Sequence, residues 1–115
     1  MESSLFVGVG QLDLLMRHSR SLKDKRQVLQ SLKVQFRNHG FSVVELGPLD
    51  DFKQGSLGLS YAASSHQQVE EAFDKAARLL VGEFQVVRKQ KEILDFSNGF
   101  EGDLFQLDTE EGEFK

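Results

Sequence analysis

Ser19-Arg20-Ser21-Leu22-Lys23-Asp24-Lys25-Arg26 marks the point where an apolar strand is followed by a helix. Ser21 is a suitable N-cap, and Asp24 completes a capping box with Asp in the usual place of Glu or Gln. Three cations occupy the first turns, where the helix dipole disfavours each of them by about 0.3–1 kcal/mol. We interpret this arrangement as an anion-binding surface, because free backbone N–H groups and cations converge at a helix start.

The surrounding sequence predicts the element order strand, helix, strand, strand, helix, strand. The strands are expected at Leu5–Leu15, Phe41–Leu46, Leu57–Ala63 and Phe84–Phe96; one helix runs from Leu22 to a stop at Gly40, and the other from a Ser65/Gln68 capping box to Gly82. Gly8 and Gly10 in the first strand allow another element to approach closely. The order is typical of an α+β ferredoxin-like βαββαβ sandwich, in which two helices cover one face of a four-stranded antiparallel sheet.

Composition indicates one globular domain, expected at residues 1–98, followed by an acidic C-terminal tail at 99–115. The chain has 115 residues, 39% of them hydrophobic, with ten Phe, one Pro and no Cys, which argues against a disulfide-stapled secreted scaffold. The apolar run Leu5–Met16 is too short to span a bilayer, and no signal segment is recognised. We therefore expect a cytoplasmic protein with no membrane partner.

The net charge of −4 conceals two oppositely charged segments. Residues 17–37 contain seven Lys or Arg against Asp24, a net +6, whereas residues 99–115 contain six acids against Lys115, a net −5. A partner feels the charge within a Debye length of about 8 Å, so the basic segment matters more than the total. The tail either solvates the protein as a disordered segment or covers the basic segment and competes with an anionic partner.

Several short matches carry a resemblance to a known family. They are Gly8-Val9, the run Arg20–Arg26, Val28-Leu29-x-Ser31-Leu32, Arg37-Asn38, Val43, Glu45-x-Gly47 and Leu57-Gly58. Over roughly residues 6–96 the chain resembles the YlxP-like family, small bacterial proteins classed as a domain of unknown function. The resemblance implies a ferredoxin-like fold, no established catalytic residues and a role near the ribosome or RNA, since such genes commonly accompany translation genes. Phe52 replaces the family's usual Trp, and the acidic tail is an addition.

A basic stripe on the first helix supplies the candidate site. Lys23, Arg26, Gln30, Lys33 and Arg37 fall within about 80° of helical arc and have no acidic partner at i+4 spacing, so they could follow a phosphate backbone. An ordinary solvated helix face is the alternative. Lys25 points toward the apolar arc, either as a snorkelling stem or as an anion ligand beside Arg17, His18 and Arg20. The predicted anion- or RNA-binding residues are Arg17, Arg20, Lys23, Lys25, Arg26, Lys33 and Arg37.

Enzymatic and base-stacking interpretations have less support. The acylphosphatase signature is absent, and no Asn occurs between residues 39 and 97. The third strand offers Ser56 and Gly58 where RNA-recognition motifs place stacking aromatics, which leaves Tyr61. Asp50 and Asp51 fit a turn, and His18, His39 and His66 lack metal-ligand spacing.

We therefore predict a non-enzymatic accessory protein, without cofactor or metal, that binds structured RNA or a ribosomal particle through the first helix. One alternative is a homodimer or protein-binding module that uses the open sheet face, with Leu57, Leu59 and Tyr61 if that side faces outward. A distant alternative is a small-anion or acyl-phosphate enzyme.

Overall fold

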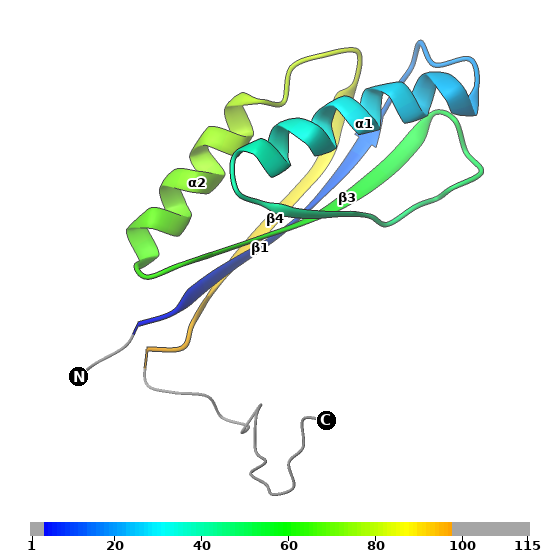
Figure 1. Cartoon of the computed structure of the whole chain (residues 1–115). Coiled ribbons are helices and arrows are strands. Elements are labelled where there is room, and N and C mark those ends of the chain that lie inside the picture. Colours follow the sequence, from blue (N-terminus) through cyan, green and yellow to red (C-terminus); the bar gives the residue numbers. More distant parts are fainter. Residues whose placement is uncertain (1–3, 98–115) are drawn as a thin grey trace, which may run out of the picture.

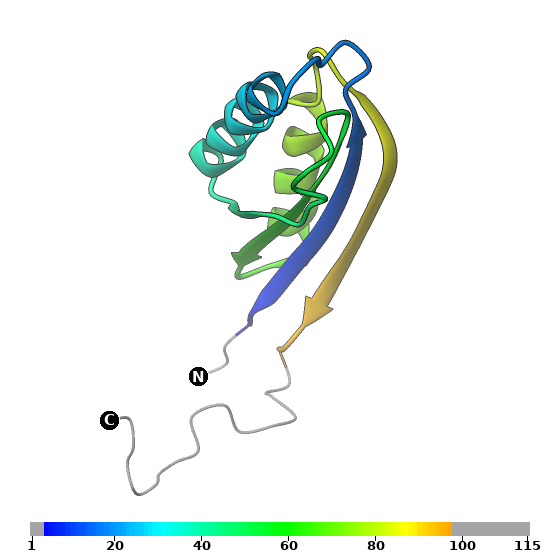
Figure 2. The same ribbon diagram turned by 90° about the vertical axis from the view of Figure 1, so that its right-hand side faces the viewer.

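The computed structural model describes residues 4–97. Its elements are β1 (Phe6–Leu15), α1 (Leu22–Asn38), β2 (Ser42–Glu45), β3 (Gln54–Ala63), α2 (His66–Arg78) and β4 (Gln85–Asp95). The strands form one sheet in the order β2-β3-β1-β4, and each neighbouring pair is antiparallel. Both helices lie on one face of the sheet (Figures 1 and 2), which confirms the predicted α+β, ferredoxin-like arrangement. The predicted tail, 99–115, lies outside the described residues.

The helix termini follow local sequence signals at three of their four ends. Ser21 Oγ accepts a hydrogen bond from the Asp24 N–H at 3.1 Å, and Ser65 Oγ accepts one from the Gln68 N–H at 3.1 Å. Gly40 ends α1 with a φ of +91°, a conformation that suits glycine.

The predicted end of α2 at Gly82 is wrong. The helix ends at Arg78, and the N–H groups of Leu79 and Leu80 donate to the carbonyls of Ala76 and Ala77. These bonds span three residues, so they tighten the last turn and stop the α-helix. Leu79 and Leu80 then pack against the core, which apolar periodicity alone does not distinguish from continued helix.

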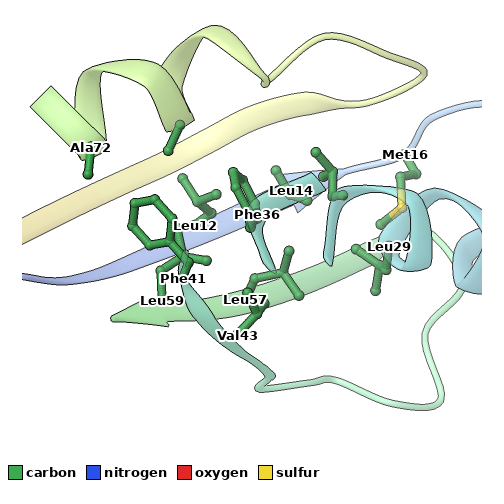
Figure 3. Packing of buried hydrophobic residues seen from close by; sticks show 12 residues of the cluster. Leu12, Leu14, Met16, Leu29, Phe36, Phe41, Val43, Leu57, Leu59 and Ala72 are labelled. Atoms are coloured by element: carbon green, nitrogen blue, oxygen red, sulfur yellow. The ribbon is translucent and has the colours of Figure 1, made fainter. Parts of the chain in front are cut away.

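The core lies between the sheet and the two helices (Figure 3). Leu12 and Leu14 of β1, Phe36 of α1 and Leu57 and Leu59 of β3 are all buried there. The outward-facing role considered for Leu57, Leu59 and Tyr61 is therefore wrong for the two leucines. Tyr61, on the same side of β3, packs against Phe41 with the ring centroids 5.0 Å apart and the ring planes tilted by 44°.

Gly8 permits α2 to pack directly on β1. A Cβ at this position would lie 2.4 Å from Phe73 Cε1 and 2.6 Å from Val69 Cγ1. Gly10 is similarly close, with Phe73 Cε2 at 3.0 Å. The predicted close approach over these two glycines is confirmed, and it fixes the position of α2 on the sheet.

Candidate anion-binding surface

The start of α1 is capped by its own residues. Asp24 lies in the first turn, and its carboxylate accepts a hydrogen bond from the Arg20 backbone N–H at 2.8 Å. The helix dipole thus already has a negative group at its N-terminal end. Any anion-binding role must therefore rest on exposed cationic side chains, and the helix end alone gives no reason for it.

Lys25 is buried, which corrects its prediction as a surface anion ligand. The residue is 2% exposed, and its Nζ donates hydrogen bonds to the carbonyl oxygens of Pro48 at 2.5 Å and Asp51 at 2.6 Å. Both carbonyls belong to the β2–β3 connection, which contains the cis Gly47–Pro48 bond. The snorkelling alternative expected the Lys25 ammonium to reach solvent, whereas the ammonium lies beneath this loop.

Lys53 makes the reciprocal connection. Its Nζ donates to the carbonyl of Arg17 at 2.7 Å and to that of Ser19 at 3.0 Å. Asp51 stabilises the turn as predicted, because its Oδ1 accepts the Lys53 N–H at 2.8 Å. Lys25 of α1 and Lys53 of the β2–β3 connection thus tie the first turn of α1 and the loop before it to that connection. Sequence reasoning missed Lys53, since its loop carries no periodic signal.

Three other members of the predicted set are engaged within the fold. The Arg17 guanidinium donates to Gln85 Oε1 through Nε at 3.2 Å and Nη2 at 2.9 Å. Lys33 Nζ lies 3.4 Å from Glu45 Oε1 on β2. Arg37 Nη2 lies 3.5 Å from the carbonyl oxygen of Val43. The stripe on α1 therefore has an acidic partner after all, supplied by a strand that helical spacing does not consider.

Arg20, Lys23 and Arg26 remain as exposed cations at the N-terminal end of α1. Within residues 4–97, their side chains make no hydrogen bond or ion pair. Lys23 and Arg26 are spaced i, i+3, so their Cβ atoms are neighbours at about 5–6 Å. We call Arg20, Lys23 and Arg26 the α1 cationic end.

An open groove continues from this end along α1. It measures about 670 Å³ and is lined by Leu22, Lys25, Arg26, Gln27, Gln30, Ser31, Lys33, Glu45 and Leu49. Amide and hydroxyl groups of Gln27, Gln30 and Ser31 add neutral hydrogen-bonding capacity beside the Arg26 guanidinium. The groove thus combines these polar groups with the apolar side chains of Leu22 and Leu49, and the Glu45 carboxylate also borders it.

The open face of the sheet has a polar centre. Asp13 accepts a hydrogen bond from Ser56 Oγ at 2.5 Å, and Arg88 Nη1 lies 3.7 Å from its other carboxylate oxygen. The Ser56 hydroxyl is the main reason why the pKa of Asp13 lies below its ordinary value, and Gln11 and Arg88 act in the same direction. This cluster is internally satisfied, and exposed apolar groups such as Val9 and Val44 lie around it.

The described residues contain no group of three His, Cys, Asp or Glu side chains placed to hold a metal ion. In the same part of the chain, no helix is long and apolar enough to cross a membrane.

Comparison with known proteins gives the family of the chain. It belongs to the family described as "Protein of unknown function (DUF503)", whose sequence model matches residues 7–92. The match begins at the second residue of β1 and ends within β4, so it includes α1, β2, β3 and α2 entirely. No curated protein matches the chain.

Proposed function

We propose that this protein is a non-enzymatic cytoplasmic accessory protein that binds structured RNA or a ribosomal particle electrostatically. The observation that carries the proposal is the α1 cationic end, whose three exposed side chains have no partner among residues 4–97. Arg17, exposed in the same loop as Arg20, would add a fourth cation at the rim of this surface. The resemblance of the run Arg20–Arg26 to the YlxP-like family supports binding to RNA or the ribosome, because that family's genes commonly accompany translation genes.

The lack of ring side chains from β3 on the open sheet face favours RNA contacts through phosphates over stacking on bases. On β3, this face presents Ser56, Gly58 and Ser60, which have no rings. Single-stranded RNA is commonly read by aromatic side chains on such a sheet, whereas double-stranded RNA is recognised through its backbone and shape. The proposed ligand is therefore a structured RNA that contacts α1 through its phosphates.

Co-sedimentation with ribosomal subunits at low and high salt tests this proposal. The variant Lys23→Ala/Arg26→Ala removes two of the three free cations, and we expect it to lose binding. Lys75→Ala/Arg78→Ala is the matched control, because it removes two exposed cations from α2 and changes the net charge equally. Absence of wild-type binding at low salt, or equal loss in both variants, would refute the proposal.

The salt dependence gives a quantitative measure. If Arg17 and the three residues of the α1 cationic end each neutralise one phosphate, the logarithm of the binding constant should fall against that of salt concentration with a slope of about −2.8 to −3.6. Removing Lys23 and Arg26 should reduce the slope by about 1.4–1.8. A slope near zero would indicate an apolar contact instead.

A further inference from the structure

β4 is a long edge strand with little protein around it. It has eleven residues and hydrogen-bonds with β1 on one side, while its other edge borders no strand of the described chain. Most of its residues are exposed on both faces, and Figure 2 shows it at the outer margin of the sheet. An exposed edge of this length is a template for pairing with another strand.

We propose that two copies of this chain pair antiparallel through β4, about a two-fold axis at Gln90, to form an eight-stranded sheet. Arg88, Gln90 and Glu92 share the open face, because their β1 partners are Asp13, Gln11 and Val9. A two-fold axis at Gln90 places Arg88 of each copy opposite Glu92 of the other. The strand is thus complementary to itself, and opposite charges directly across two strands are stabilising.

Neighbouring registers lack this complementarity. An axis at Lys89 or Glu92 would place that charged residue opposite its own copy, which is destabilising. An axis at Lys91 would place Arg88 opposite Leu94 and Glu92 opposite Gln90, so neither charge would meet an opposite one. At Gln90, two neutral amides meet. The Oε1 of each accepts a hydrogen bond from Arg88 Nη2 of its own chain at 3.0 Å, and its NH2 group can donate across the seam.

The chosen register also places Lys89 opposite Lys91 on the helix side of the sheet. Lys91 Nζ, however, lies 2.9 Å from Glu70 Oε1 of its own chain, so its charge is already compensated. At the two ends of the paired segment, Val87 of one copy lies opposite Ile93 of the other, and Leu94 lies opposite Val86. Val87 sits at an irregularity of β4 and has no partner on β1. Val87 and Leu94 are 55% and 37% exposed, and the pairing would cover part of that surface.

The pairing has a consequence for the proposed RNA site. A two-fold axis perpendicular to the sheet leaves all four helices on one face, and β2, next to α1, becomes the outer strand at both ends. With strands about 4.8 Å apart, the two outer strands are separated by roughly 34 Å. Two α1 cationic ends on the same face would make binding bivalent. That consequence rests on the proposed function, whereas the pairing itself does not.

Sedimentation equilibrium of the full chain tests the pairing. We expect the wild type to be dimeric at micromolar to submillimolar concentrations. Arg88→Glu and Glu92→Arg should each raise the dissociation constant at least tenfold, since each puts like charges across the seam. The double variant Arg88→Glu/Glu92→Arg should restore dimers, and mixing the two single variants should give heterodimers.

Two controls keep the test decisive. Because Arg88 also contacts Asp13, circular dichroism must show that Arg88→Glu is folded; Glu92 has no described ion pair, so Glu92→Arg tests the seam even if Arg88→Glu does not fold. Lys75→Glu on α2 is a charge reversal away from the strand and should leave the dimer unchanged. A monomeric wild type, unaffected single variants, or no heterodimer in the mixture would overturn the proposal.

Discussion

Replacing Lys25 with methionine probes the contact between α1 and the β2–β3 loop. The substitution keeps a long unbranched side chain in the buried site but removes the ammonium that donates to the carbonyls of Pro48 and Asp51. Hydrogen bonds to a charged group contribute about 1.5–3 kcal/mol each, so the gross loss is about 3–6 kcal/mol. Part of this is recovered, because the variant no longer buries a charge and water can reach carbonyls in an exposed loop.

We therefore expect Lys25→Met to lower the free energy of unfolding by about 2 kcal/mol. For a domain of this size, that corresponds to a fall in Tm of about 8–16 °C. Urea denaturation followed by far-UV circular dichroism measures the first quantity and calorimetry the second. Lys23→Met is the matched control, since Lys23 is exposed and its loss should change stability by less than about 0.5 kcal/mol.

The same variant separates a structural lysine from a ligand-binding one. Below its unfolding temperature, Lys25→Met should bind ribosomal particles within about twofold of wild type, because the ammonium does not reach the surface. The reasoning is refuted if Lys25→Met is as stable as wild type. It is also refuted if the folded variant loses binding as fully as Lys23→Ala/Arg26→Ala.

Three further predictions follow from packing, titration and charge. Gly8→Ala should destabilise the fold by about 1–3 kcal/mol in chemical denaturation, because its Cβ would overlap the Phe73 ring; unchanged stability would contradict the close packing of α2. Ser56→Ala should raise the pKa of Asp13 toward its ordinary value, as measured by NMR titration. Because the wild-type pKa is lowered, the stability that Ser56 contributes is present above about pH 4 and is lost as pH falls through the folded-state pKa; an equal stability difference at pH 2 and pH 7 would contradict this. Deleting residues 99–115 removes a net −5 and should tighten polyanion binding, and unchanged affinity would exclude competition by the tail.

Local signals in the sequence predicted the order and type of all six elements. Ser21 with Asp24, Ser65 with Gln68, and Gly40 act within a few residues of themselves, so the caps form as expected. The alternation of large apolar and small residues in β3 assigned its side chains to two faces. It did not show which of these faces the helices would cover. The end of α2 was misplaced because a tightened turn after Arg78 looks the same in sequence as further helix.

The candidate site depended much more on contacts between distant segments. Helical spacing placed Lys25 on the apolar arc but could not reveal that carbonyls 23 and 26 residues further along the chain would receive its ammonium. Similarly, Glu45 reaches Lys33 because β2 passes beside α1 in the folded chain. The type of a residue gives its charge, and the residues next to it in the sequence largely give its local conformation. Whether that charge is buried, paired or free is decided by which distant backbone and side-chain groups the tertiary structure places beside it.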